Sequence, residues 1–188
     1  MKHIVIISSS VRTGAKSPRV AQYFKKYIEE KQLATAEIAD LAAYNFPVFN
    51  ERLRFQQDPA PKVLEFAGKI KKADGILIVT PEYNGGIPAS LKNVTDLLYD
   101  EWKHKPIAIS MVSNGIFGGT QVITSLLFTL WKIGATMVPA MFPVPTIEKT
   151  FDEQGVPLDP EAINKRADVF LNELIWYMDR INAGLPQH

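Results

Sequence analysis

Hydrophobic positions along the chain alternate between short apolar runs and longer stretches with helical spacing. The short runs predict strands, and they lie at residues 4–7, 36–41, 76–79, 107–112 and 136–138. Between and after the runs, apolar side chains recur every three or four residues, which predicts amphipathic helices. These helices are marked by Val20 to Ile28, Val63 to Ile70, Leu91 to Leu98, Val122 to Ile133 and Ile163 to Ile181. Asp159, followed by Pro160, is the expected cap of the last one.

This alternation of strands and helices predicts one α/β domain. Strands separated by helices need crossover connections, which give a parallel sheet with helices on both faces. The length of 188 residues corresponds to about one domain, so we assign residues 1–188 to it. Ligands of such sheets bind outside the carboxyl ends of the strands. The loops after the first, third and fourth strands are therefore the places to look for a site.

The amino-acid composition limits the classes of protein to which the chain can belong. Hydrophobic residues make up 46% of the chain and charged residues 22%, as in globular proteins. There is no cysteine, which excludes disulfide scaffolds, thiolate zinc sites and cysteine nucleophiles. A net charge of +1 argues against a nucleic-acid partner. No apolar stretch approaches the ~20 residues of a membrane span and no targeting segment is visible, so we expect a cytoplasmic protein without a membrane partner.

The loop after the first strand, residues 8–19, has the composition of a phosphate site. It combines hydroxyls, small residues and cations just before a predicted helix. Helix N-termini attract anions, Ser10 and Ser17 can donate hydrogen bonds, and Arg12 can add a charge-assisted one. The alternative is a solvated loop with an ordinary Ser/Thr helix cap.

The other two loops suit a planar ring. In residues 81–88, Tyr83 can offer an aromatic face, and the amides near Asn84 and Gly85 can reach the edge of a heteroaromatic ring. Residues 113–119 are rich in glycine, which lets the main chain approach a ligand closely. Taken singly, the two segments can also be a rigid turn and a flexible connector.

The order of the three loops carries a resemblance to a known family. Ser10-Val11-Arg12 with Ser17, then Pro81-Glu82-Tyr83-Asn84-Gly85 leading into 88–96, then Gly118-Gly119, resembles the NADPH-dependent FMN reductase family over residues 3–140. The resemblance implies a flavodoxin-like three-layer α/β/α sandwich with strand order 2-1-3-4-5. It also implies FMN as cofactor, with its phosphate in the first loop and its ring between the other two. The implied cofactor-binding residues are Ser10, Arg12, Ser17, Pro18, Arg19, Pro81, Glu82, Tyr83, Asn84, Gly85, Ser113, Gly115 and Gly118.

The activity that the resemblance implies is two-electron transfer from NADPH or NADH, through FMN, to a quinone, an azo compound or a similar small acceptor. Such chemistry needs no catalytic side chain, since the cofactor carries the electrons. In agreement, none of the three histidines lies in the loops, and no metal-binding spacing such as H-E-x-x-H occurs. For Glu82 we favour a structural role in the turn over that of a general base. Family members also lead us to expect a homodimer or homotetramer.

Two other functions are compatible with such a fold. One is a flavodoxin-like electron carrier without substrate turnover, although carriers of this kind are usually strongly acidic. The other is a response-regulator-like domain, which needs clustered carboxylates where this chain has Ser8-Ser9-Ser10. We also expect four apolar side chains in the core, with a subunit interface as the alternative: Trp131, Met137, Met141 and Phe142.

Overall fold

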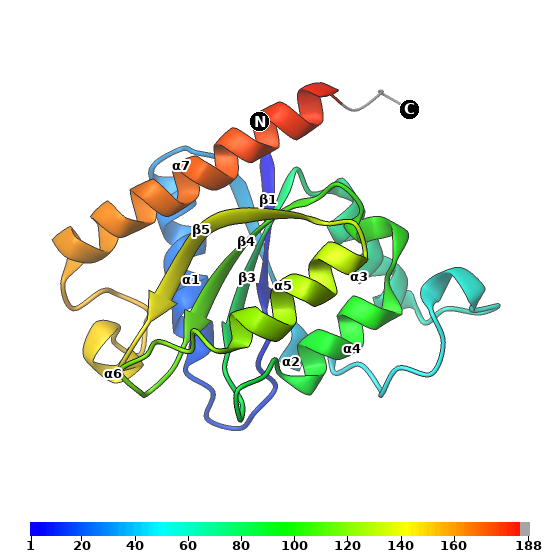
Figure 1. Cartoon of the computed structure of the whole chain (residues 1–188), viewed down its shortest axis with the longest axis horizontal. Helices are drawn as coiled ribbons and strands as arrows, with labels where there is room; N and C mark the ends of the chain where they lie inside the picture. Colours follow the sequence, from blue (N-terminus) through cyan, green and yellow to red (C-terminus); the bar gives the residue numbers. More distant parts are fainter. Residues whose placement is uncertain (185–188) are drawn as a thin grey trace.

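A computed structural model describes residues 1–184 and contains one parallel sheet. Its strands are β1 (His3–Ser8), β2 (Thr35–Asp40), β3 (Gly75–Pro81), β4 (Pro106–Val112) and β5 (Thr136–Val144). They are arranged in the order β2-β1-β3-β4-β5, and every neighbouring pair is parallel (Figure 1). The predicted flavodoxin-like sheet is confirmed. All the carboxyl ends lie at one edge, where the three candidate loops meet.

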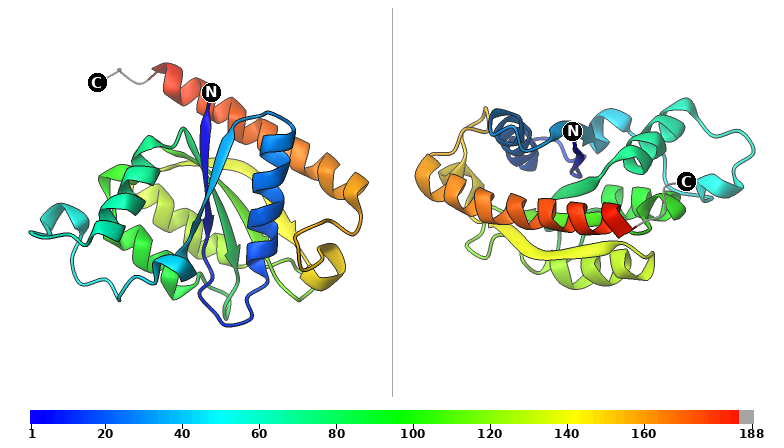
Figure 2. Two further views of the ribbon diagram at one scale, coloured as in Figure 1. Left: turned by 180° about the vertical axis from the view of Figure 1, so that it is seen from behind. Right: turned by 90° about the horizontal axis from the view of Figure 1, so that it is seen from above.

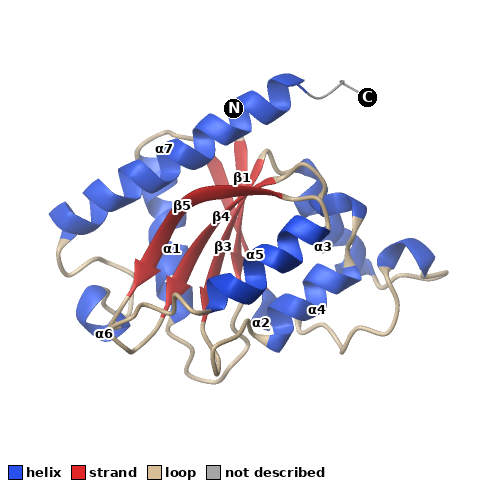
Figure 3. Cartoon of the chain, in the orientation of Figure 1, coloured by secondary structure: helices blue, strands red, loops and turns tan. Residues whose placement is uncertain are grey.

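Helices cover both faces of the sheet, which makes a three-layer sandwich (Figures 2 and 3). One face packs against α1 (Ser17–Glu30) and α7 (Pro160–Gly184). The other packs against α3 (Pro61–Lys72), α4 (Ala89–Leu97) and α5 (Val122–Lys132). Shorter elements, which the hydrophobic spacing did not predict, are α2 (Leu41–Tyr44), α6 (Ile147–Thr150) and 3-10 turns at Leu53–Phe55 and Asp100–Trp102.

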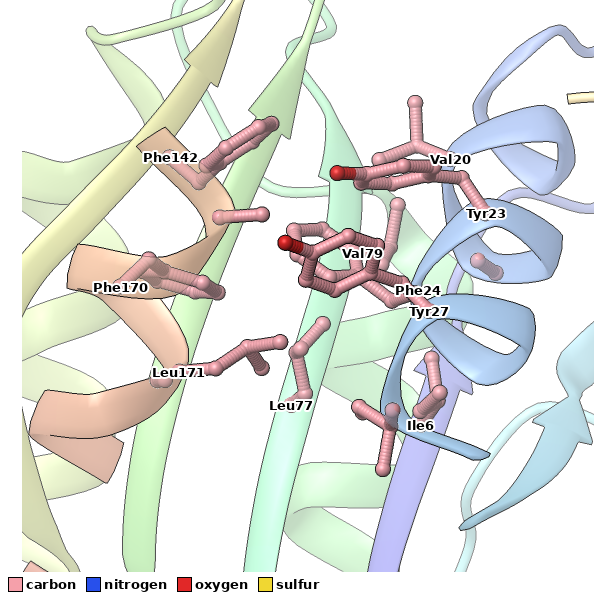
Figure 4. Close-up of a cluster of buried hydrophobic side chains, with 14 of the residues drawn as sticks. Ile6, Val20, Tyr23, Phe24, Tyr27, Leu77, Val79, Phe142, Phe170 and Leu171 are labelled. Carbon is pink, nitrogen blue, oxygen red and sulfur yellow. The ribbon is translucent and has the colours of Figure 1, made fainter. Parts of the chain in front are cut away.

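Successive side chains of a strand point to opposite faces of the sheet, so one short apolar run contributes to the hydrophobic cores on both faces. In β1, Ile4 and Ile6 point into the α1/α7 core, whereas Val5 and Ile7 point into the opposite core. All four are fully buried, and each contributes about 1.5–3 kcal/mol of hydrophobic stabilisation. The α1/α7 core also contains an aromatic group (Figure 4), in which the Phe24 ring lies 5.0 Å from that of Phe142.

The strand β5 extends further than its hydrophobic pattern predicts. The apolar run ends at Val138, but pairing with β4 continues to Val144, past two prolines. Proline cannot donate to a neighbouring strand, and β5 tolerates it because it lies at the edge of the sheet. The register shifts between Ile107 and Ile109, opposite the segment that contains Pro139.

The core prediction is wrong for two of its four residues. Phe142 is buried and Met137 half-buried, but Trp131 is 63% exposed and Met141 51% exposed. Because β5 is an edge strand, the side chains that face outward from it and from α5 have no further layer to pack against.

The cap of α7 is as predicted. The Asp159 carboxylate accepts a hydrogen bond from the Ala162 amide at 3.1 Å. This helix is long but carries many charged positions, and within residues 1–184 no helix has the combined length and apolarity that crossing a bilayer needs.

Candidate active site

A cavity of about 280 Å³ opens at the carboxyl edge of the sheet. The loops that follow β1, β3 and β4 form most of its wall, and the start of α6 closes one side. This is the position at which doubly wound folds bind their ligands. Its lining residues are Ser10, Arg12, Gly14, Ala15, Lys16, Ser17, Pro81, Glu82, Tyr83, Val112, Ser113, Asn114 and Ile147.

The first loop surrounds this cavity with hydrogen-bond donors. Ser17, the first residue of α1, is only 3% exposed, and its hydroxyl has no hydrogen-bond partner within residues 1–184. A buried hydroxyl without a partner costs about 1–3 kcal/mol, so its position in the wall indicates a polar ligand. In the described part of the chain, no side chain caps the N-terminus of α1. Arg12 and Lys16 add positive charge, and the donor set therefore suits an anion.

An acidic residue from a distant segment faces the same loop. Glu148, in α6, forms an ion pair with Lys16 although 132 residues separate them in the sequence. The hydrogen bond from Lys16 holds the pKa of the Glu148 carboxyl below its ordinary value. Glu148 thus partly neutralises one of the two cations that line the cavity.

The second loop forms a tight two-residue hairpin. The amides and carbonyls of Tyr83 and Gly86 exchange two hydrogen bonds of 3.0 Å. Both central residues have positive φ, 52° at Asn84 and 76° at Gly85, which is the geometry that Asn-Gly favours. The turn holds the Tyr83 hydroxyl 2.6 Å from the Ser10 hydroxyl, and this contact ties the second loop to the first.

The second loop is also fastened to the third. A carboxylate oxygen of Glu82 accepts a hydrogen bond of 3.2 Å from the amide of Gln121, at the start of α5. This contact favours the structural role expected for Glu82. Close packing fixes the third loop, since a Cβ on Gly119 would meet the backbone of Val112 at 3.2 Å. Gly119 also has a φ of +75°, so glycine is favoured there for two reasons.

The structure brings some of the predicted site residues to the cavity and leaves others outside its wall. Those that line it are Ser10, Arg12, Ser17, Pro81, Glu82, Tyr83 and Ser113. Those outside are Pro18, Arg19, Asn84, Gly85, Gly115 and Gly118. The Arg19 guanidinium instead donates to the carbonyl oxygen of Phe151 at 3.3 Å, because α1 turns its third residue toward that segment.

Several residues that line the cavity were not among the predicted site residues, and only some of them carry a signal in the sequence that points to the site. Lys16 directly precedes Ser17 in a loop already recognised as cationic, so its charge was a usable signal. Ile147 has no such signal: it follows a proline-containing strand and reaches the cavity only because β5 ends beside β4. The remaining residues of this kind are Gly14, Ala15, Val112 and Asn114.

Comparison with known proteins places the chain in a family. The model of the NADPH-dependent FMN reductases matches residues 2–149. An NAD(P)H-dependent FMN reductase of Schizosaccharomyces pombe is 32% identical over 161 residues, which cover 84% of this chain and 78% of the relative. An NADPH azoreductase of a Bacillus species is 31% identical over 137 residues, 72% of each chain.

A solved structure agrees in fold. The flavoenzyme FerB, an NAD(P)H:(acceptor) oxidoreductase of Paracoccus denitrificans, superimposes with a TM-score of 0.77 at 22% identity. The superposition covers 96% of this chain and 98% of FerB. The chain belongs to the NADPH-dependent FMN reductase family. Its class is therefore that of FMN-dependent NAD(P)H oxidoreductases with a flavodoxin-like fold.

Proposed function

We propose that the cavity at the carboxyl edge of the sheet holds FMN and that the protein reduces small acceptors with electrons from NADPH or NADH. The single observation that carries the proposal is the buried hydroxyl of Ser17, which has no hydrogen-bond partner among residues 1–184, in a wall that also contains Arg12 and Lys16. A phosphate monoester offers acceptor oxygens and a charge of −1.5 to −2 at pH 7, which this donor set matches.

The other two loops provide for the ring. Tyr83, held by Ser10, presents an aromatic face at the cavity, and Pro81 and Val112 add apolar surface. Exposed amides at the Asn84-Gly85 tip lie next to Tyr83, within the reach of a longer ligand than the cavity alone would hold. On this ground Asn84 and Gly85 remain proposed contacts, whereas Gly115 and Gly118 remain proposed contacts on the family resemblance alone.

The protein's part in the reaction is binding and orientation. The chemistry that FMN supplies when it is bound is two-electron transfer from the nicotinamide to the acceptor. The cations of the first loop neutralise the phosphate, and the Glu82 and Tyr83 contacts link the three loops to one another. No side chain needs to act as a nucleophile or a base.

Reconstitution tests the cofactor. The protein, stripped of any bound flavin, is titrated with FMN and with riboflavin while flavin fluorescence is followed. Because the proposed phosphate contacts include charge-assisted hydrogen bonds worth about 1.5–3 kcal/mol each, riboflavin is expected to bind at least about 100-fold more weakly. Equal affinity for the two flavins would contradict a phosphate site in the first loop.

Turnover tests the reaction. Anaerobic addition of NADPH or NADH is expected to bleach the visible absorbance of the bound FMN, and a quinone or an azo dye is expected to restore it. Steady consumption of NADPH without any added protein partner distinguishes an enzyme from an electron carrier. The net charge of +1 already favours the enzyme, since carriers rely on strong charge to find their partners.

Self-association and location are further parts of this proposal. Phe128 and Trp131 on α5, with ring centroids 5.7 Å apart, and Met141 on β5 are exposed apolar side chains that support a homodimer or homotetramer. Light scattering after gel filtration measures the assembly, and a monomer would overturn it. A cytoplasmic location also remains a prediction, with which the cysteine-free sequence agrees, and cell fractionation tests it.

A further inference from the structure

A second cavity, of about 230 Å³, lies beyond the first loop from the proposed flavin site. Its wall comes from the first loop, from the segment that follows β2, and from the first turns of α4. Most of the wall is apolar, and these side chains are Val11, Leu41, Phe46, Val48, Ala89 and Val94. This cavity is distinct from the one that contains Ser17, because the two share no lining residue.

The two cavities are nevertheless neighbours. Val11 lines the second cavity, while Ser10 and Arg12, the residues on either side of it, line the first. A single stretch of main chain thus separates them. The two cavities therefore adjoin at the first loop.

The chemistry of the wall indicates a neutral ligand. Among the residues that the structure describes, no charged one lines the second cavity, and its polar side chains are Asn45, Ser90 and Asn93. Two of these are already engaged, since the Ser90 hydroxyl donates to the Ser9 carbonyl and Asn93 binds main chain. NAD(P)H carries phosphates that would lose hydration there without a cation to replace it. An uncharged aromatic compound would lose little hydration free energy in this cavity and would gain apolar contact with its wall.

One side chain holds the outer wall in place. Residues 46–49 have no regular secondary structure, yet they pass over α4 at a fixed position. The Asn93 amide oxygen accepts from the Phe49 amide at 2.6 Å, and its nitrogen donates to the Pro47 carbonyl at 2.8 Å. Phe46 is further held by stacking on Tyr44, with centroids 5.0 Å apart and planes at 10°. The wall is therefore preorganised.

We propose that this second cavity binds the apolar ring system of a neutral aromatic acceptor, of which a fused-ring quinone is the test case, and that Asn93 is a positioning residue for it. The inference rests on the proposed function, because an acceptor needs reduced FMN in the adjacent cavity. It adds the place where the acceptor's non-reacting part is held.

Filling the cavity is the first test. Ala89 is exposed at the start of α4, so Ala89→Phe adds a ring within the cavity without disturbing the core. Ala43→Phe, an exposed position on α2 outside the lining, is the matched control. For A89F we expect KM for 1,4-naphthoquinone to rise about tenfold, as loss of the second ring's burial requires. KM for ferricyanide, which is too polar for the cavity, and the FMN dissociation constant should change by less than about twofold, as should every value for A43F.

Removing the hydrogen bonds that hold residues 47–49 in the cavity wall is the second test. Asn93→Ala removes both hydrogen bonds to residues 47–49, and Lys92→Ala, next to it on α4, is the control. The expected signature in N93A is a raised KM for naphthoquinone with unchanged kcat and unchanged ferricyanide turnover. A structural role alone would lower all activities together or release FMN.

The outcomes separate this inference from the proposed function. If the wild-type protein fails to bind FMN, or if NADPH fails to bleach bound FMN, the proposed function is wrong and the inference fails with it. If both hold but A89F and N93A reduce naphthoquinone like the wild type, only the acceptor cavity is wrong. Equal losses with naphthoquinone and ferricyanide would likewise overturn the cavity assignment.

Discussion

The Ser17 hydroxyl offers a substitution whose effects on folding and on cofactor binding have opposite signs. In the flavin-free protein this buried group has no partner within residues 1–184, so Ser17→Ala removes an uncompensated desolvation cost. We expect the free energy of unfolding of the apo-protein to rise by about 1 kcal/mol. In the complex, the same change deletes a hydrogen bond to a charged phosphate, worth about 1.5–3 kcal/mol. FMN affinity should therefore fall about 10- to 150-fold.

Urea unfolding of the apo-protein and fluorescence titration with FMN measure the two effects separately. Ser8→Ala is a matched control, because the Ser8 hydroxyl is also buried and has no partner in the described chain, but Ser8 lies in β1, outside the cavity wall. It should stabilise the apo-protein in the same way and leave FMN affinity unchanged. An S17A protein that binds FMN within about twofold of wild type would refute the assignment of Ser17 to the phosphate. So would an S8A protein that loses as much affinity as S17A.

Three further substitutions test other parts of the structure. Glu148→Gln frees Lys16 from its ion pair, so FMN affinity should rise a few-fold at low salt. The gain should disappear at about 1 M salt. A loss of FMN affinity would instead mean that the ion pair preorganises the loop. Gly155→Ala should destabilise the protein by at least about 2 kcal/mol more than Gly14→Ala in urea unfolding. Both glycines have positive φ, but of the two only Gly155 has backbone in the way of a Cβ, namely the Arg19 carbonyl oxygen. Equal costs would show that the clash is relieved. Burial and the hydrogen bond to Asp168 raise the pKa of Tyr27 to about 12 from an ordinary 10.0. Between pH 10 and 12 the native state therefore keeps a proton that the unfolded chain loses. The free energy of unfolding should fall over this range, by up to about 1.4 kcal/mol per pH unit. In Tyr27→Phe, this decline, measured by urea unfolding at a series of pH values, should be shallower, and an unchanged slope would contradict the shift.

The helices and strands of this fold could be predicted from the amino-acid sequence because each depends on a local pattern. Buried parallel strands appear as continuous apolar runs such as 76–79, and amphipathic helices appear as spacings of three and four. The parallel sheet then requires that the loops after β1, β3 and β4 meet, so a site could be located before any distance was known. The Asn84-Gly85 turn was also local, since those two residues favour its positive φ values.

Local patterns did not reveal which residues the fold would bring together from far apart. The family resemblance included Arg19 among the cofactor-binding residues, but in the structure its guanidinium donates to the Phe151 carbonyl oxygen. The position of residues 47–49 was likewise not predicted, because it depends on hydrogen bonds to Asn93 on α4. In both cases the partner lies far away in the sequence, where no spacing rule applies.

Hydrophobic periodicity and loop motifs act over a few residues, so the amino-acid sequence is enough to predict the class of fold, the edge of the sheet that carries the site and the family. Contacts between distant elements, by contrast, bring Ile147 and Glu148 to the site, leave β5 at an edge where its prolines are tolerated, and leave Trp131 and Met141 exposed. These features depend on which elements become neighbours and which have none. That depends on packing across the whole chain, which no short segment encodes.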